Sequence, residues 1–360
     1  MDFAISLGQS RMGAELTWSG TPNSHLYVSG QSGSGKSCFL KHCIAQLPQR
    51  GVRCIVFDYA GDLHRIGGPC NCLDARTQVG IDPFRPLILG DGCQERPYDT
   101  AARIAETVLS IGGVQGGLQQ AGIRNVLKDY IDRGATKSGF SGLIAQIQND
   151  AELARRMAPM LIRLQDLNHL LSSGSQNFSW KLEQPGITVL RFDTLPNISA
   201  QILMTQFFLF DLWAEKLSWG ESSCPVVVVL DECQRFRFTD NSIFTRILRE
   251  GRKYHFSGWF ASQWISEKGA TKALSQAALK AYFYPGNDQV NALARHLCSG
   301  TYSLEDYKKM IQGLRTGEFL YLDHHGSLLV NCVPRMVEET VDAQRYAKKR
   351  SITTEIGAGC

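Results

Sequence analysis

An octapeptide near the start of the sequence can bind a polyphosphate. The segment from Gly30 to Ser37 has the pattern G-x-x-x-x-G-K-S and follows the apolar stretch Leu26-Tyr27-Val28. Its glycines allow the loop to fold around phosphates, with successive backbone N–H groups pointing inward. Lys36 can then reach the β- and γ-phosphates, and the Ser37 hydroxyl can bind Mg²⁺. The residues expected to contact the nucleotide are Gly30, Gln31, Ser32, Gly33, Ser34, Gly35, Lys36, Ser37 and Cys38.

An acidic pair at the end of a strongly apolar segment supplies groups that hydrolysis of the nucleotide requires. Residues 226–230 are four valines and a leucine, and Asp231 and Glu232 follow them. Such an unbroken β-branched run is typical of a central parallel strand that is covered on both faces. The two acids then lie at the carboxyl edge of the sheet, where the phosphate-binding loop also lies. We expect Asp231 to bind Mg²⁺ and Glu232 to polarise the attacking water, which predicts an ATPase that uses ATP and Mg²⁺.

Two further side chains are candidates for the same reaction. Gln263 ends the strand expected beside that of Asp231, so its amide can sense the γ-phosphate. Arg252 ends a helix, and its guanidinium can bind phosphate oxygens of a neighbouring subunit's nucleotide. The alternative for Arg252 is a basic helix end that complements the helix dipole. The expected catalytic residues are therefore Glu232, Lys36, Arg252 and Gln263, and the expected metal ligands are Ser37 and Asp231.

The elements that must position these residues begin as a β-α-β unit. A hairpin over 3–7 and 14–18 precedes a strand over 25–29, a helix over 36–47 and a strand over 52–58. The following residues up to 98 are expected to be mostly loop, because glycine and proline recur in them. Helical spacing then dominates in four segments, 101–110, 118–133, 143–154 and 157–171.

Strands and helices alternate again in the second half of the sequence. Strands are expected at 187–192, 226–230, 258–261, near residue 281, 318–322 and 327–331, and helices at 198–217, 241–254, 271–278 and 288–297. The sequence therefore predicts an α/β fold with a largely parallel central sheet and an inserted all-α subdomain. We expect a first part of the core at 1–98, the helical insertion at 99–180, and the second part of the core with a C-terminal tail at 181–360.

Composition is that of an ordinary globular protein. The 360 residues are 43% hydrophobic and 20% charged, and the net charge of +4 is too small to identify a polyanionic partner. The eleven cysteines, an odd number, predict free thiols in a reducing compartment and a cytoplasmic location. No signal peptide is visible, and the longest apolar segment, 202–213, is too short to span a membrane. Any membrane association is therefore expected to occur through a partner.

The segment Cys70-Asn71-Cys72, with His64 and Cys93 nearby, raises the question of a zinc site. Its C-x-C spacing differs from the C-x-x-C spacing that is usual for zinc ligands, and no second close pair follows. Loop thiols are therefore the favoured interpretation.

Taken together, the motifs resemble those of the FtsK–HerA superfamily of P-loop motor ATPases, which includes chromosome translocases, HerA DNA motors and conjugative coupling proteins. The segments that carry the resemblance are 5–8, 25–37, 58–63, 82–84, 226–232, 251–253 and 261–263. It implies a RecA-like P-loop NTPase core, and it implies the same roles for Lys36, Ser37, Asp231, Glu232, Arg252 and Gln263. It also implies a ring, usually a hexamer. Only 24 residues precede His25, so the N-terminal barrel or membrane region of larger relatives is not expected within this sequence.

Two uses of ATP remain open at this point. The favoured one is translocation of double-stranded DNA through the ring, with basic side chains gripping phosphates without reading sequence. Candidates for this grip are Lys128, Arg133, Arg155, Arg156, Arg163, Arg345, Lys348, Lys349 and Arg350, although such charges are more often solvated faces. The alternative is an ATP-switched docking subunit of a secretion, conjugation or defence complex. A GTPase is disfavoured because the sequence has no N-K-x-D segment.

Overall fold

The structure, a computed structural model, describes most of the chain. The described residues are 3–20, 23–88, 92–110, 117–134, 138–171, 178–195, 197–220, 223–240, 242–263, 272–298, 302–322 and 328–333.

Within the described residues, eleven strands form one sheet in the order β2-β1-β11-β10-β9-β3-β8-β7-β4-β6-β5. The run from β9 to β5 is parallel throughout, and it comprises β9 (Leu279–Phe283), β3 (Leu26–Ser29), β8 (Phe256–Ser262), β7 (Val226–Leu230), β4 (Arg53–Asp58), β6 (Gly186–Arg191) and β5 (Asn71–Asp74). The predicted α/β class with a largely parallel sheet is therefore confirmed.

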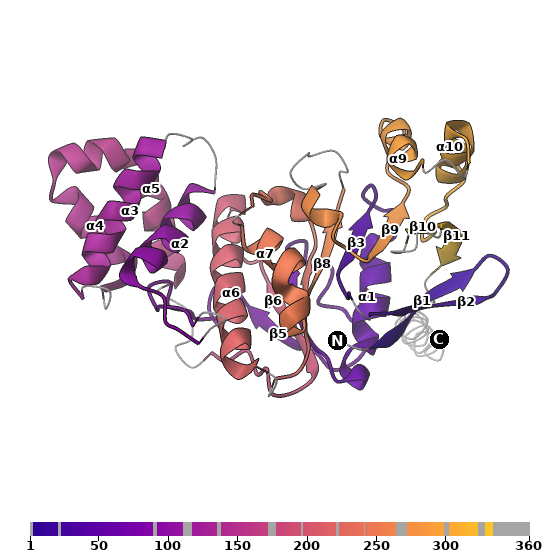
Figure 1. The fold of residues 1–360 in the computed structure, drawn as a ribbon, viewed down its shortest axis with the longest axis horizontal. Helices are drawn as coiled ribbons and strands as arrows, with labels where there is room; N and C mark the ends of the chain where they lie inside the picture. Colours follow the sequence, from indigo (N-terminus) through magenta and orange to yellow (C-terminus); the bar gives the residue numbers. More distant parts are fainter. Residues whose placement is uncertain are drawn as a thin grey trace, which may run out of the picture.

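The sheet continues beyond β9 with antiparallel strands. These are β10 (Phe319–Leu322), β11 (Leu328–Val333), β1 (Ala4–Ser10) and β2 (Glu15–Ser19). The hairpin expected near the N-terminus is β1 with β2, and it lies at the edge of the sheet, to the right in Figure 1.

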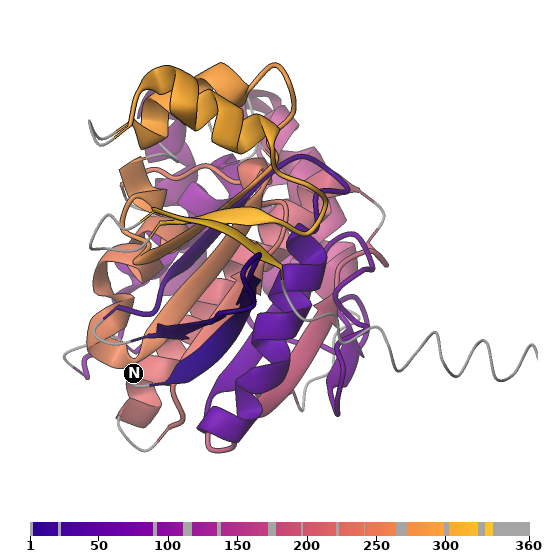
Figure 2. The ribbon, with the colours of Figure 1, turned by 90° about the vertical axis from the view of Figure 1, so that its right-hand side faces the viewer.

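Both faces of the parallel sheet are buried, as the valine run predicts. Val226, Val228 and Leu230 of β7 belong to one hydrophobic core, whereas Val227 and Val229 belong to the other. Helix α1 (Lys36–Gln46) covers the second face, and α6 (Ile198–Trp219) and α7 (Ile243–Glu250) cover the first (Figures 1 and 2). Period-2 alternation between two covered faces makes every residue of this strand apolar.

Four helices lie together at one end of the molecule, to the left in Figure 1. They are α2 (Pro97–Leu109), α3 (Gly117–Asp132), α4 (Gly139–Gln148) and α5 (Ala151–Leu171), and both α2 and α5 contact α6. The predicted helix over 143–154 is wrong at its end, because α4 stops at Gln148 and α5 begins at Ala151. The Asp150 side chain accepts a hydrogen bond from the Leu153 backbone N–H and so favours a new helix start there.

Two elements are absent from the sequence prediction. Strand β5 lies in the stretch predicted to be loop, and α10 (Leu304–Gln312) follows α9 (Val290–Leu297) before β10. The predicted helix over 271–278 is largely wrong, since only 272–274 are helical among its described residues. The predicted helix over 241–254 is α7 followed by the 3-10 turn Gly251–Tyr254.

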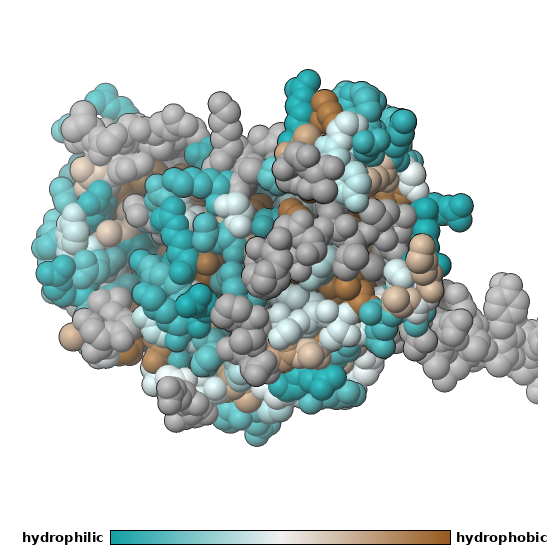
Figure 3. All heavy atoms as spheres, turned by 45° about the vertical axis from the view of Figure 1, so that its right-hand side comes forward, coloured by the Kyte–Doolittle hydropathy of each residue, from teal (hydrophilic) through white to brown (hydrophobic). Residues whose placement is uncertain are grey.

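The outer surface of the described residues is mainly hydrophilic on the face in Figure 3, with apolar side chains in small separate spots. None of the described helices has the length and apolar character that a membrane crossing requires.

Candidate nucleotide site

The phosphate-binding loop lies between two parallel strands and is fixed to both. Gly30 N–H donates to the Ser262 carbonyl of β8 at 3.2 Å, and Gln31 N–H donates to the Tyr284 carbonyl after β9 at 2.8 Å. From the other side, Gly317 N–H donates to the Ser34 carbonyl at 2.9 Å. The loop is therefore held in shape by three separate segments of the chain.

Glycine is required in this loop where backbone approaches backbone. Gly35 has a φ of 110°, and a Cβ built on it would lie 2.8 Å from Gly317 Cα. A Cβ on Gly30 would lie 2.6 Å from Phe283 Cβ. Any larger residue at these two positions would force the loop away from β9 and from the turn before β10.

The groups around the loop fit a polyphosphate. Ser34 Oγ is buried and has no hydrogen-bond partner within the described part of the chain. No side chain caps the first turn of α1, so its N–H groups remain available to an anion. Lys36 Nζ donates to the carbonyls of Gly30 and Gln31, at 2.7 and 2.9 Å, which are bonds that phosphate oxygens can replace. Ser37 and Cys38 lie in the same turn and are half-buried.

The acidic pair lies at the same edge of the sheet as Lys36. Burial lowers the pKa of Lys36, and the negative charges of Asp231 and Glu232 oppose this effect. Asp231 is buried and accepts a hydrogen bond from the Glu232 backbone N–H at 2.8 Å. Burial raises the pKa of Asp231 to about 6, which Lys36 partly counteracts. The structure thus brings the two predicted segments together, and a divalent cation would supply the positive charge that this buried carboxylate needs.

Glu232 stands at a sharp turn directly after β7. Its φ of 55° is in the left-handed region, which a residue with a side chain rarely adopts. Its carboxylate accepts a hydrogen bond from Gln263 Nε2 at 2.7 Å, so the predicted amide at the end of β8 reaches the predicted water-polarising acid.

Arg252 does not join this group within one chain. It is exposed in the 3-10 turn before β8, at the opposite edge of the sheet from the loop. The seven residues of β8 separate the two edges by about 20 Å at roughly 3.3 Å per residue. Any contact of Arg252 with a nucleotide therefore requires a second copy of the chain.

Packing explains why the residue before Arg252, Gly251, is a glycine. A Cβ on this residue would lie 2.2 Å from the Phe256 carbonyl oxygen, so the turn into β8 has room for glycine only.

Residues 16–66, which contain the loop, match the family model described as the type IV secretion-system coupling protein DNA-binding domain. Among solved structures, VirB4 of Thermoanaerobacter pseudethanolicus aligns with a TM-score of 0.68 and 15% identity, over 92% of this chain and 96% of that chain. The chain has a coupling-protein-type P-loop NTPase fold. The plasmid coupling protein TrwB in complex with ADP and Mg²⁺ aligns with a TM-score of 0.63 and 16% identity, over 87% and 85% of the two chains. No curated protein matches the sequence.

These matches confirm the resemblance to the FtsK–HerA superfamily at the level of the fold.

Segment 58–63, one of those that carry the resemblance to this P-loop NTPase fold, is organised by one buried carboxylate. Asp58 accepts hydrogen bonds from the backbone N–H groups of Gly61, Asp62 and His64, at 2.9, 3.1 and 3.0 Å. Its charge also contributes to the raised pKa of Asp231, so the loop after β4 borders the nucleotide site.

Cys70 directly precedes β5, and Cys72 is the second residue of this strand. Cys70 Sγ and Cys72 Sγ are 3.5 Å apart, and both lie close to the His64 carbonyl oxygen. The described side chains include no group of three histidine, cysteine, aspartate or glutamate residues placed to hold a metal ion. The interpretation of both residues as loop thiols is wrong for Cys72, which lies in a strand, because pairing with β6 continues to this edge of the sheet.

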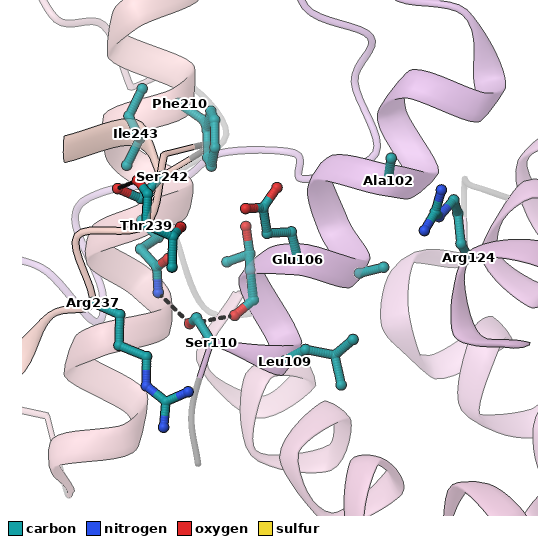
Figure 4. A pocket seen from close by; sticks show the side chains of 13 residues that line it. Ala102, Glu106, Leu109, Ser110, Arg124, Phe210, Arg237, Thr239, Ser242 and Ile243 are labelled. Atoms are coloured by element: carbon teal, nitrogen blue, oxygen red, sulfur yellow. Dashed lines mark hydrogen bonds between the residues drawn. The ribbon is translucent and has the colours of Figure 1, made fainter. Parts of the chain in front are cut away.

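A polar cavity of about 630 Å³ lies elsewhere, between α2, α3, α6 and the segment before α7 (Figure 4). Gln206 Nε2 of α6 donates to Ser110 Oγ across it at 2.6 Å, and Ser110 Oγ donates to the Thr107 carbonyl. Burial raises the pKa of Glu106, an effect that Arg246 and Arg124 oppose. The cavity lies where helices α2 and α3 meet the core, and none of the site residues expected from the sequence lines it.

Sequence reasoning missed one side chain at the nucleotide site. Gln234, two residues after Glu232, donates from Nε2 to Glu232 Oε2 at 2.5 Å. The spacing D-E-x-Q places an amide next to the acidic pair, but only the 3-10 turn Cys233–Arg235 brings it back onto the carboxylate.

Proposed function

We propose that this chain is a Mg²⁺-dependent ATPase whose hydrolysis drives movement of double-stranded DNA through a ring of identical subunits. The observation that carries the proposal is the convergence of Lys36, Asp231, Glu232 and Gln263 at one edge of the sheet, beside a loop shaped for phosphates. The family-model description and the coupling-protein fold support the choice of DNA as the substrate.

Each residue has a defined task in this proposal. Lys36 and the N–H groups of the loop bind the β- and γ-phosphates. Ser37 and Asp231 would hold Mg²⁺, which would supply positive charge near the phosphates. Glu232 orients and polarises the attacking water, and Gln263 links that carboxylate to the end of β8. A buried aspartate with a raised pKa is well suited to bind a cation, because the cation removes the penalty for its charge.

Arg252 acts on the nucleotide of a neighbouring subunit in this proposal. Its place at the opposite edge of the sheet supports action between copies, as in a closed ring, for which a hexamer is the expected form.

The grip on DNA is assigned to exposed basic side chains. Arg155 on α5 and Arg133 after α3 are exposed, whereas Lys128 is paired with Asp132 at 2.6 Å and is a weaker candidate. The side chains of Arg156 and Arg163, and residues 345, 348, 349 and 350, lie outside the described part of the structure. Contacts of this kind are electrostatic, so they weaken as salt concentration rises.

The test is the ATPase rate with and without linear duplex DNA over a salt series. A DNA motor predicts stimulation by duplex DNA that declines steeply as salt increases. Turnover that duplex DNA leaves unchanged at low salt would contradict the translocase proposal.

The second candidate is an ATP-switched docking subunit of a secretion, conjugation or defence complex. The coupling-protein fold and the similarity to VirB4 favour this class as well. In that case a protein partner, and not DNA, raises the rate of ATP hydrolysis in the same assay.

A further inference from the structure

Both carboxylate oxygens of Glu232 are bound by amide groups. Gln263 Nε2 donates to Oε1 at 2.7 Å, and Gln234 Nε2 donates to Oε2 at 2.5 Å. An amide N–H group only donates hydrogen bonds, so neither glutamine nitrogen can accept a proton from the attacking water. An oxygen that already accepts a strong hydrogen bond from an amide is a weaker acceptor for a second donor.

Gln234 is also tied to the end of β8. Its Oε1 accepts a hydrogen bond from the Gln263 backbone N–H at 3.3 Å, so one side chain spans both the acid and the neighbouring strand. A displacement of the β8 end therefore breaks the hydrogen bond from the Gln263 N–H that orients the Gln234 amide.

The turn that carries Gln234 is fixed on its other side by Arg235. Arg235 Nη1 donates to Gln201 Oε1 of α6 at 2.8 Å, and its guanidinium lies over the ring of Tyr59. The backbone of this turn is thus anchored on one side, while the Gln234 side chain bridges the Glu232 carboxylate and the backbone of Gln263, directly after β8.

We propose that Gln234 is a positioning residue that restrains Glu232 when the enzyme is not stimulated. Hydrolysis at full rate requires Glu232 Oε2 to exchange the Gln234 amide for the attacking water, and a shift of β8 permits this exchange. The inference rests on the proposed ATPase function and adds to it a regulated state of the catalytic carboxylate.

The test compares Gln234→Ala and Gln234→Asn with the unmodified full-length chain in Mg²⁺-dependent ATP hydrolysis without DNA. Asparagine keeps the amide but shortens the side chain by one methylene, so it cannot bridge both contacts. Both variants are expected to raise the unstimulated kcat about tenfold, the factor that a hydrogen bond to a charged group contributes, and to change KM by less than about twofold. Stimulation of ATP hydrolysis by linear duplex DNA should shrink by the same factor.

Two controls separate this inference from the proposed function. Gln184→Ala removes an exposed glutamine far from the site and should leave kcat unchanged. Glu232→Gln, alone and combined with Gln234→Ala, should abolish turnover. A kcat that stays level or falls in both Gln234 variants, while Glu232→Gln is inactive and the variants melt at the temperature of the unmodified chain, would overturn the restraint alone. Turnover that survives Glu232→Gln would overturn the proposed function and the restraint with it.

Discussion

Asp231, the proposed metal ligand, illustrates how a residue can work against the stability of the fold. Its carboxylate is buried at the end of β7, and burial raises its pKa from 3.8 to about 6. A raised carboxyl pKa means that the folded chain binds its proton more tightly than the unfolded chain. The stability that Asp231 contributes is therefore present below about pH 4 and is lost as the pH rises through about 6.

Replacing this carboxylate by an amide should stabilise the nucleotide-free chain at neutral pH. A pKa raised to about 6 corresponds to about 3 kcal/mol as an upper limit, so Asp231→Asn should gain roughly 1–3 kcal/mol at pH 7.5. The gain should be much smaller near pH 4, where the carboxyl is protonated in the folded chain and about half protonated in the unfolded chain. Denaturant unfolding of the two proteins at both pH values measures the difference, and an equal difference at the two values would contradict this account of the burial.

The individual site residues differ in how well the sequence predicts them. The loop residues and the Asp231-Glu232 pair stand in strong patterns, and the structure places them together because parallel strands share one carboxyl edge. Gln234 stands in no recognised pattern, since its contact depends on the unusual φ of Glu232 and on a short 3-10 turn. Backbone strain of that kind cannot be inferred from residue types.

Among the elements, the turn before β10 has a direct connection to the phosphate-binding loop. Gly317 in this turn donates its N–H to the Ser34 carbonyl, and Glu318 is bound by Arg11 of the β1–β2 hairpin through Nε at 2.8 Å. Arg11 also donates to the Gly313 carbonyl at 3.0 Å. The hairpin at the sheet edge thus helps to hold the turn against the loop.

Removal of this arginine should loosen the nucleotide site without touching the reacting groups. Arg11→Ala is expected to raise KM for ATP a few-fold with little change in kcat, because the turn that supports Ser34 loses an anchor. Arg50→Ala, a change at an exposed arginine beside α1, is the matched control. Steady-state kinetics measure the effect, and a fall in kcat at constant KM would show that the turn acts on the chemical step instead.

The elements that the sequence predicts well are those with strong periodicity. The parallel strands other than β5, and helices α1, α6 and α9, are found within a few residues of the prediction. Strand β5 could not be predicted from the sequence, because Asn71-Cys72-Leu73-Asp74 has no β-branched residue and pairs only at the sheet edge. Helix α10 does carry a sequence signal, since Ser303 and Asp306 have the S-x-x-D spacing of a capping box.

At the scale of the whole molecule, the nucleotide loop and Arg252 lie at opposite edges of one sheet. A single subunit therefore contains two halves of a proposed site that can meet only between copies. The four helices α2 to α5 extend from one end of this core, and α2 and α5 contact α6 (Figure 1).

Action of Arg252 across an interface can be tested by mixing inactive subunits. Arg252→Ala should bind ATP normally but reduce turnover at least about a hundredfold, the usual loss for a residue that stabilises transition-state charge. Mixed with Lys36→Ala subunits, it should regain part of the activity, because some interfaces then combine an intact loop with an intact arginine. Full activity of Arg252→Ala alone would remove the role assigned to this residue.

The most direct test of the central claim is Mg²⁺-dependent ATP hydrolysis by the unmodified chain, Glu232→Gln and Lys36→Ala, together with equilibrium binding of ATP by each. The account predicts turnover in the unmodified chain, a loss of at least about a hundredfold in Glu232→Gln with ATP binding retained, and loss of both binding and turnover in Lys36→Ala. Hydrolysis by Glu232→Gln at the rate of the unmodified chain would show that the acidic pair and the loop do not form one catalytic site.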